Sequence, residues 1–371
     1  MKIGKNVYAI RGVDSEVRMF HGYQTPVGTT YNAYLVQDGQ QITLVDSVKH
    51  DFADAFLGDI RAIIGERLID NLICNHAEPD HSGALPALAK AYPGAAIYGT
   101  ANCGKIIRAY YPDIAADRYH TVKKGDTLPT GGSTFHFYPM PMVHWPDSMA
   151  TYLAEERILF SNDAFGQHIG TGELFDEELP WETLASRAGD YYANIILPYG
   201  GQVGRAWETL GGLDIEMVCP SHGVILRRDF ARIADKYGQW RQNQTDAAKA
   251  VIIYDTMWGT TRKLACRLRD EYEQKGISAE IIDLSQKHAS YAMAQLLEAR
   301  HICVGSPTLN NNMMPTVSAF LTCMGGLKPK NRAGRAFGAY GWSGESIGQI
   351  HEALAGYGFE LEPPLKAMWN I

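Results

Sequence analysis

The sequence lacks several features that would each indicate a different class of protein. No apolar run is long enough to span a bilayer, and the start of the chain has no apolar signal region. With 34 basic and 41 acidic residues, the chain has no cationic excess for binding nucleic acid. A Gly-Lys-Thr element is absent, which excludes a nucleoside triphosphatase loop of that kind. A cytoplasmic protein with neither membrane nor nucleic acid as partner is therefore expected.

Cysteine is scarce and scattered. The six cysteines include no Cys-x-x-Cys pair, so no iron–sulfur or rubredoxin module is expected within this chain. Cys74, Cys219 and Cys303 lie in apolar, strand-like segments, as is typical of buried thiols in a reducing cytoplasm. The length of 371 residues is enough for two domains, each with its own core.

Residues 75–83 concentrate four side chains that can bind a metal: His76, Glu78, Asp80 and His81. The apolar residues before them predict the end of a buried strand, and Ser82-Gly83 with the apolar residues that follow predicts the start of a helix. The four side chains are therefore expected on a strand-to-helix loop, where ligands held by a rigid scaffold can converge. A polar surface loop is the alternative, but histidines and carboxylates spaced this closely are typical of a metal site.

Three later residues can complete such a site: His144, Asp163 and His222. Each follows an apolar, strand-like segment, so all three can emerge at one edge of a sheet sandwich. Taken singly, each is as well explained as a cap or a satisfied loop residue. Their order after the first cluster favours a shared site for two metals.

The carboxy-terminal third begins after a polar stretch, residues 241–246, that is typical of a domain boundary. Residues 249–254 predict a buried strand, and residues 262–274 predict a helix. Between them, the hydroxyls of Thr256, Thr260 and Thr261 and the flexible Gly259 precede a helix amino terminus, which is a suitable phosphate site. A capped helix without a ligand would look similar.

Two further predicted strands, residues 300–305 and 334–340, end in loops of a related kind. Strands that alternate with helices favour an open parallel sheet, whose ligand lies beyond the carboxyl ends of the strands. This third of the chain resembles flavodoxin, and the resemblance implies bound FMN with its phosphate on the first loop. The expected contacts are Thr256, Met257, Trp258, Gly259, Thr260, Thr261, Pro307, Thr308, Leu309, Asn310, Asn311, Tyr340, Gly341, Trp342, Ser343 and Gly344. Trp258 and Trp342 are expected to flank the flavin ring, with a position in the core as the alternative for each.

The first two-thirds of the chain resembles the metallo-β-lactamase superfamily, an αβ/βα sandwich with a binuclear site. Zinc hydrolases of that superfamily commonly have His where this chain has Glu78. The resulting ligand set holds three carboxylates and no thiolate. Such a set suits iron better than structural zinc.

Joined in this order, the two parts resemble the flavodiiron proteins, also called A-type flavoproteins, over essentially the whole chain. That family reduces dioxygen to water, nitric oxide to nitrous oxide, or both. The resemblance implies one iron on His76, Glu78 and His144, a second iron on Asp80, His81 and His222, and Asp163 as the bridge. It also implies that His21 and one of Tyr191 and Tyr192, with Tyr192 as our choice, line the gas pocket. A structural role is the alternative for each of these residues.

The expected architecture is an amino-terminal metallo-β-lactamase-like αβ/βα sandwich, residues 1–246, and a flavodoxin-like doubly wound parallel sheet, residues 249–371. Family members usually continue for some tens of residues, so the last helix of the second domain is expected to be missing here. Position 221 is Ser where Asp is common before the last ligand, and this difference can tune His222.

The resemblance further implies an electron donor such as rubredoxin or a reduced deazaflavin, and a head-to-tail homodimer or a dimer of dimers. A zinc-dependent hydrolase of the glyoxalase II type with a regulatory flavodoxin domain is one alternative. An electron-transfer flavoprotein with a structural metal site is another. The sequence does not decide between dioxygen and nitric oxide as substrate.

Overall fold

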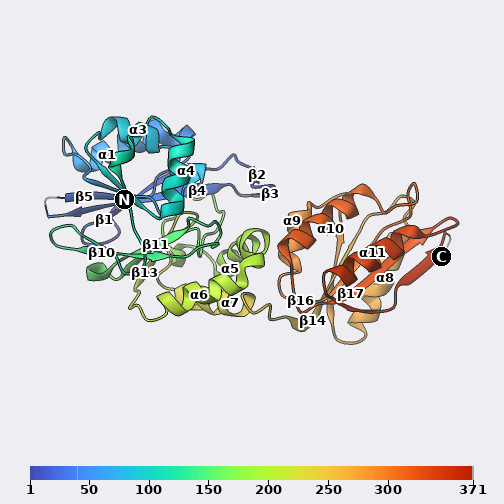
Figure 1. Cartoon of the computed structure of the whole chain (residues 1–371). Coiled ribbons are helices and arrows are strands. Elements are labelled where there is room, and N and C mark those ends of the chain that lie inside the picture. The colour runs from blue at the N-terminus through green and yellow to red at the C-terminus, as the bar shows by residue number, and fades with distance from the viewer. Residues whose placement is uncertain (40, 370–371) are drawn as a thin grey trace. The chain divides into compact units, whose positions relative to one another are not determined.

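The computed structural model describes residues 1–39 and 41–369, which form two compact units (Figure 1). The first unit consists of three segments: Met1–Met19, Thr25–Ala188 and Gly201–Lys236. The second consists of Phe20–Gln24, Gly189–Gly200 and the chain from Tyr237 onward. The domain limits expected from the sequence, 1–246 and 249–371, stay a prediction.

The first unit contains two β-sheets with a shared apolar core. The six-stranded sheet has the order β1 (Val7–Asp14), β4 (Thr29–Asp38), β5 (Gln41–Val45), β6 (Asn71–Ile73), β7 (Ala96–Gly99) and β8 (Tyr119–Thr121). The five-stranded sheet has the order β13 (Met217–Pro220), β12 (Ile158–Asn162), β11 (Met149–Leu153), β10 (Thr134–Pro139) and β9 (Thr127–Pro129). Tyr34 and Ile73 from the first sheet pack in one cluster with Phe137 and Phe160 from the second. Burying these inner faces stabilises the sandwich and fixes the strand ends that carry the ligands.

Helices cover the outer faces of this sandwich. Figure 1 shows α1, α3 and α4 on the outer side of one sheet and α6 and α7 on the outer side of the other, which gives αβ/βα layers. The helical segments are η1 (His50–Phe52), α1 (Ala53–Ile64), α2 (Pro79–Ser82), α3 (Leu85–Ala91), α4 (Ala101–Tyr110), η2 (Ala116–Arg118), η3 (Ala154–Glu156), η4 (Asp176–Glu178), α5 (Trp181–Tyr191), α6 (Gly200–Leu210) and α7 (Phe230–Trp240).

The second unit is built on a parallel sheet with the strand order of flavodoxin. Its strands are β15 (Ser278–Asp283), β14 (Asp246–Tyr254), β16 (Ala299–Gly305), β17 (Ala333–Tyr340), β18 (Glu360–Leu361) and β19 (Leu365–Met368), and both of the last two pair with β17. Its helices are α8 (Thr260–Glu273), α9 (Ala289–Gln295), α10 (Pro315–Leu327) and α11 (Glu345–Gly356). The last five residues of β14 are all buried, as expected for a strand covered by helices on both faces. The β2 (Met19–Phe20) and β3 (Tyr23–Gln24) hairpin and the short η5 (Tyr192–Ile196) and η6 (Leu197–Tyr199) complete the elements.

One local element differs from the expectation. The helix predicted to start at Ser82-Gly83 is confirmed as α3, which begins at Leu85, but a short helix that was not predicted, α2, begins before it at Pro79. Proline suits the first helical position, where no backbone N–H is needed. Asp80 and His81 therefore lie on a helical turn, whereas His76 and Glu78 lie on the loop before it. No helix among residues 1–39 and 41–369 has the length and apolar character needed to cross a membrane.

Candidate metal centre and flavin site

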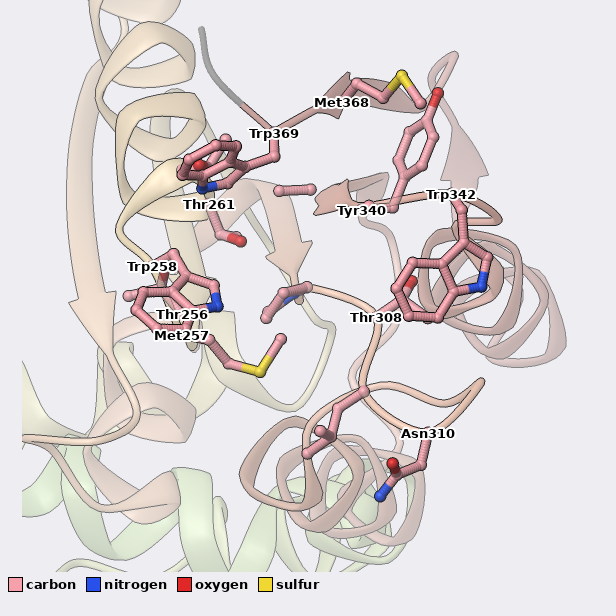
Figure 2. A pocket seen from close by; sticks show the side chains of 15 residues that line it. Thr256, Met257, Trp258, Thr261, Thr308, Asn310, Tyr340, Trp342, Met368 and Trp369 are labelled. Atoms are coloured by element: carbon pink, nitrogen blue, oxygen red, sulfur yellow. The ribbon is translucent and has the colours of Figure 1, made fainter.

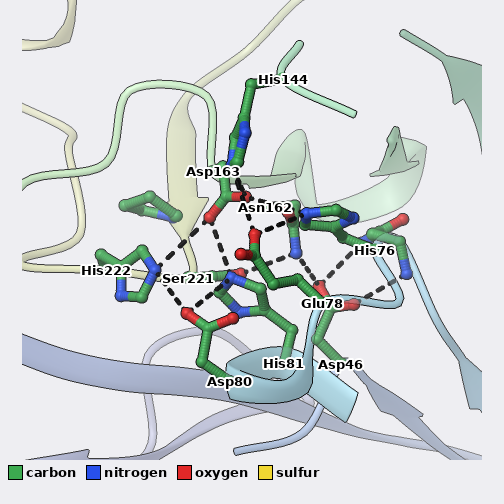
Figure 3. A network of polar contacts seen from close by, with 12 residues as sticks. Asp46, His76, Glu78, Asp80, His81, His144, Asn162, Asp163, Ser221 and His222 are labelled. Atoms are coloured by element: carbon green, nitrogen blue, oxygen red, sulfur yellow. Dashed lines mark hydrogen bonds and ion pairs between the residues drawn. The ribbon is translucent and has the colours of Figure 1, made fainter. Parts of the chain in front are cut away.

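The expected metal ligands come from four separate segments and meet at one edge of the sandwich (Figure 3). His76 and Glu78 follow β6, His144 lies between β10 and β11, Asp163 directly follows β12, and His222 follows β13. The parallel pairing of β12 and β13 brings the last two of these to the same edge. Directly after His222, Gly223 has a φ of 83°, and a Cβ there would lie 2.2 Å from the side-chain oxygen of Gln167. A larger residue at this turn would therefore displace the ligand loop.

Asp163 lies between two groups of ligands and directs one oxygen to each. Its Oδ2 atom is 3.5 Å from Nε2 of His76 and 3.2 Å from Nε2 of His144. Its Oδ1 atom is 3.0 Å from Nε2 of His81 and 3.5 Å from Nε2 of His222. One carboxylate thus faces two ligand sets, which is the arrangement that a bridging ligand between two metal ions requires.

The two ligand sets are compact enough for one cation each. The potential ligand atoms of the set His76, Glu78, His144 and Asp163 all lie within 4.8 Å of one another, and the same holds for Asp80, His81 and His222. Ligand atoms that surround a metal at about 2.0–2.2 Å lie roughly 3.0–3.5 Å from their neighbours. Nε2 of His222 and Oδ2 of Asp80 are 3.2 Å apart, which agrees with that spacing.

Burial without hydrogen bonds also indicates that cations belong here. Both carboxylate oxygens of Asp80 and of Asp163 and both ring nitrogens of His81 form no hydrogen bond within the described part of the chain. All three residues are at most 5% exposed. The imidazoles of the same cluster offset part of this buried charge, and a bound cation would offset the rest. The donor set therefore fits two divalent cations, and its nitrogen and oxygen atoms suit iron.

The pKa values within the cluster reflect this concentration of charge. Burial alone would lower the pKa of His81, but the carboxylates of Asp80 and Asp163 outweigh burial and raise it to about 9. Burial alone would raise the pKa of Asp163, yet the imidazoles of His81 and His144 hold it well below its usual range. The carboxylates are thus ionised at neutral pH and ready to bind a cation.

A second set of polar residues, which the sequence analysis did not identify, supports the ligand loops. Asp46 accepts hydrogen bonds from the Asn75 backbone N–H (2.7 Å) and from the side-chain amides of Asn75 (3.0 Å) and Asn162 (3.3 Å). The Asn162 amide also donates to Ser221 Oγ at 3.1 Å. Ser221, the residue that differs from the family pattern, therefore belongs to a network that joins the loops of the two strands before Asp163 and His222.

His168 is another residue near the centre that the sequence did not reveal. Its ring lies 4.6 Å from that of His222, and its Nδ1 atom is 2.6 Å from Thr29 Oγ1. Its position five residues beyond Asp163 was the only signal available, and spacing alone does not distinguish such a neighbour from a ligand.

The second unit contains a large cavity at the carboxyl ends of its strands. The cavity has a volume of about 860 Å³, within the range of small-molecule and cofactor sites. Figure 2 shows Trp258 and Trp342 on opposite sides of it. These two side chains are 81% and 85% exposed, so neither is a core aromatic. A flat, apolar ring fits between such walls.

Most of the expected flavin contacts line this cavity. They are Thr256, Met257, Trp258, Thr260, Thr261, Pro307, Thr308, Leu309, Asn310, Tyr340, Gly341 and Trp342. Four expected contacts, Gly259, Asn311, Ser343 and Gly344, are not among the lining residues, and their roles stay predictions. The cavity has three further lining residues, Ala339, Met368 and Trp369, which the sequence analysis missed.

The first loop is arranged to receive an anion. Gly259 has a φ of 82° and precedes α8, so the chain turns sharply into a helix amino terminus. Thr261 is fully buried, and its hydroxyl forms no hydrogen bond within the described residues although it lines the cavity. A phosphate bound at this helix amino terminus can accept that hydrogen bond. The loop therefore fits the phosphate of FMN.

His21 and Tyr192 both belong to the second unit. His21 lies in the turn between β2 and β3, and it is exposed with a φ of 50°. Tyr192 is fully buried, and its ring packs against those of Tyr237 (5.0 Å between centroids) and Trp240 (5.1 Å). Such packing fits a structural role for Tyr192, and a role in the gas pocket stays a prediction for both residues.

Together, the fold and the two sites define a metalloflavoprotein. Residues 29–223 match the model of the ODP family of β-lactamases, and residues 252–368 match that of flavodoxin. The chain is 39% identical to the nitric oxide reductase of Moorella thermoacetica, over 99% of this chain and 93% of that protein. It is 40% identical to the rubredoxin-oxygen oxidoreductase of Megalodesulfovibrio gigas, over 97% of this chain and 90% of that protein.

Solved structures agree with these relatives. The rubredoxin oxygen:oxidoreductase from Desulfovibrio gigas matches with a TM-score of 0.96 at 38% identity, over 100% of this chain and 93% of that one. The flavodiiron protein from Giardia intestinalis matches with a TM-score of 0.94 at 31% identity, over 98% of this chain and 90% of that one. The chain belongs to the flavodiiron protein family.

Proposed function

We propose that this protein is an oxidoreductase that reduces dioxygen to water, nitric oxide to nitrous oxide, or both. Its relatives are named for such activities. One observation carries the proposal: Asp163 divides its two carboxylate oxygens between two buried ligand sets, in a chain that also has a flavin-sized cavity. When bound, the two irons supply a redox centre for the gas and FMN supplies electrons one or two at a time.

The protein's own residues are proposed to hold and shield the irons. His76, Glu78 and His144 are assigned to one iron, Asp80, His81 and His222 to the other, and Asp163 to both. These seven residues are at most 8% exposed. Because bulk water is kept away, the carboxylates bind cations strongly. All ligands in this set are nitrogen or oxygen donors. The ratio of imidazole to carboxylate ligands therefore determines which metal is preferred.

The flavin is proposed to bind with its phosphate at the amino terminus of α8 and its ring between Trp258 and Trp342. The hydroxyl of Thr261 and the backbone N–H groups of this helix end orient the phosphate. Leu309 and Pro307 add apolar surface to the cavity wall. These contacts fix where the flavin sits and exclude water from one part of its surface.

A zinc hydrolase with a regulatory flavodoxin domain is the competing function. Glu78 weighs against it, because a carboxylate replaces the imidazole that zinc hydrolases of this superfamily commonly have at that position. The relatives named above are oxidoreductases, which also favours gas reduction. The names of these relatives likewise do not support an electron-transfer protein with a structural metal site.

The proposed partners are an electron donor of the rubredoxin type or a reduced deazaflavin, and a second copy of the chain in a head-to-tail dimer. A relative named rubredoxin-oxygen oxidoreductase supports a donor of this type. We place the protein in the cytoplasm, where its six free cysteines would stay reduced.

The test is a direct comparison of turnover with the two gases. Purified protein containing two irons and one FMN per chain is reduced under anaerobic conditions and mixed with dioxygen or nitric oxide in a stopped-flow instrument. Fast oxidation of the flavin by either gas, with water or nitrous oxide as product, supports the proposal. Protein that carries zinc, hydrolyses a thioester and reacts slowly with both gases would contradict it.

A further inference from the structure

Asp147 is a fully buried carboxylate that contacts a proposed metal ligand without belonging to either ligand set. Its Oδ2 atom lies 3.0 Å from Nδ1 of His76 and accepts a hydrogen bond from the backbone N–H of Ala77 at 2.8 Å. The other ring nitrogen of His76, Nε2, lies 3.1 Å from Glu78 Oε2 and 3.5 Å from Asp163 Oδ2. The imidazole is therefore held between Asp147 on one side and the ligand cluster on the other.

This contact fixes which nitrogen of His76 can bind a metal. An ionised carboxylate only accepts hydrogen bonds, so the proton of a neutral imidazole must reside on Nδ1. The lone pair of Nε2 is then free and points toward the cluster. A carboxylate behind a ligand histidine also makes the imidazole a stronger donor than a neutral acceptor does.

The loop that carries Asp147 is anchored firmly. Its backbone oxygen accepts a hydrogen bond from Thr100 Oγ1 at 3.0 Å, and the same hydroxyl caps α4 by accepting from the Cys103 N–H at 3.2 Å. The Trp145 ring packs edge-on against the ring of His76, with 5.1 Å between centroids. The loop between β10 and β11 thus supplies a ligand, a packing surface and a carboxylate to one half of the cluster.

The contacts behind the imidazoles of the other half of the cluster are of a different kind. Nδ1 of His222 lies 2.7 Å from the backbone oxygen of Thr30, a neutral acceptor. Nδ1 of His81 forms no hydrogen bond within the described residues. Asp46 is a buried carboxylate beside these loops that interacts with the charge of His81, but its hydrogen bonds come from Asn75 and Asn162 and not from a ligand imidazole.

The surroundings of the second carboxylate oxygen of Asp147 indicate that the negative charge of this residue has a role besides its two hydrogen bonds. Oδ1 is buried and forms no hydrogen bond within the described part of the chain. An asparagine could accept the same two hydrogen bonds through its single oxygen. Burying a charge that these two hydrogen bonds do not require costs free energy. We therefore expect the negative charge to interact with the cation that His76 binds.

We propose that Asp147 is a positioning residue that makes the two metal positions unequal. It holds His76 in the tautomer that binds through Nε2 and makes this imidazole the stronger donor, so the position built by His76, Glu78 and His144 holds its metal more tightly. The inference rests on the proposed diiron function, because it takes these side chains as iron ligands.

The test uses Asp147→Asn, which keeps the shape and removes the charge. We expect the affinity for one of two Fe(II) ions, measured by anaerobic competition with a chelator, to fall about 10- to 100-fold. Mössbauer spectra of the ⁵⁷Fe(II)-loaded variant should show a change in one of the two iron sites only. Thermal unfolding followed by circular dichroism reports whether the first unit is folded, and FMN content reports the same for the second unit.

Two further variants separate charge from packing. Asp176 is also fully buried in the first unit but accepts its hydrogen bonds from backbone N–H groups, including that of Asp229 at 2.6 Å. The matched control Asp176→Asn should keep both irons and the wild-type Mössbauer spectrum. Asp147→Glu keeps the charge and should hold iron better than Asp147→Asn.

The outcomes are distinct. Unchanged iron affinity and spectra in Asp147→Asn, equal losses in Asp147→Asn and Asp147→Glu, or the same loss in Asp176→Asn would each overturn the role of the Asp147 charge. Wild-type protein that binds no pair of irons would instead overturn the proposed function itself.

Discussion

The carboxylate of Glu78 faces the same half of the cluster as two imidazoles. Its Oε2 atom lies 3.1 Å from Nε2 of His76 and 3.5 Å from Nε2 of His144. With Asp80 and Asp163 it brings the number of carboxylates in the cluster to three, against four histidines. Oxygen donors of this kind favour a harder, redox-active metal, so the residue at position 78 is expected to influence which metal is retained.

Glu78→His should therefore shift the metal preference of the centre from iron to zinc. The change removes one negative charge and adds a softer donor, so we expect tighter binding of zinc, loss of iron and loss of gas reduction. Metal analysis of protein purified from cells and turnover with each gas provide the measurement. FMN content should stay at the wild-type level because the flavin cavity lies in the other unit. A variant with two irons and near-normal turnover would show that another residue selects the metal.

The pKa of His81 leads to a second prediction at this scale. In the metal-free protein its pKa is raised to about 9 by Asp80 and Asp163, which outweigh burial, so the imidazole is protonated at pH 7. A metal must displace that proton, and affinity should rise about tenfold per pH unit for each displaced proton until the pH passes the pKa. Calorimetric titration of the metal-free protein with Zn²⁺, in buffers of different ionisation enthalpy, should show proton release at pH 7. Binding without proton release would contradict the assigned protonation.

The residues of the metal centre differ in how far the sequence could reveal them. His76, Glu78, Asp80 and His81 stand close together in the chain, so their spacing alone predicted a metal site. Asp147 was not predicted, because it acts through a contact with a residue 71 positions away. Only the folded sandwich brings such a pair together, and a single aspartate in a loop has no distinguishing pattern.

At the scale of elements, the strands of the second unit were predicted well because they are buried, apolar and bounded by loops. Residues 300–305 and 334–340 were expected as strands, and β16 (Ala299–Gly305) and β17 (Ala333–Tyr340) agree with them within one residue. The contribution of β19 to the flavin cavity was not predicted. Met368 and Trp369 reach the cavity because β19 pairs with β17, and that register is a tertiary feature.

The junction between β14 and α8 leads to a prediction about flavin binding. Thr261→Val keeps the branched shape but removes the buried hydroxyl that is expected to donate to the phosphate. A hydrogen bond to a charged group contributes about 1.5–3 kcal/mol, so the Kd for FMN should rise roughly 10- to 100-fold. Fluorescence titration of the flavin-free protein measures this change.

The matched control is Thr322→Val on α10, where the threonine is exposed and its hydroxyl bonds to the Ser318 backbone oxygen at 2.9 Å. This variant should bind FMN as the wild type does. Equal affinity in the two variants would place the phosphate elsewhere in the cavity.

At the scale of the whole molecule, the sequence predicted two bodies and their order but not every segment that each contains. Phe20–Gln24 and Gly189–Gly200 group with the second unit, although they stand far before it in the chain. Asn194 shows how: its side-chain amide donates to the backbone oxygen of Ser290 at 3.2 Å. Composition and periodicity describe local runs of sequence, so they do not reveal contacts between segments so far apart.

The proposed head-to-tail dimer makes a prediction that separates electron transfer between subunits from transfer within one chain. A flavin-deficient chain, Thr261→Glu, places a negative charge against the phosphate, and an iron-deficient chain, Asp163→Ala, lacks the bridging carboxylate. Each alone should be inactive, while iron content in the first and FMN content in the second show that the unaltered site is intact. In a heterodimer isolated with two affinity tags, the intact flavin and the intact iron centre belong to different subunits, so turnover requires electron transfer between the partners. Activity of about half the wild-type value per dimer is then expected, since one of the two equivalent flavin–iron pairs survives. A heterodimer as inactive as its two parents would show that electrons pass from flavin to iron within a single chain.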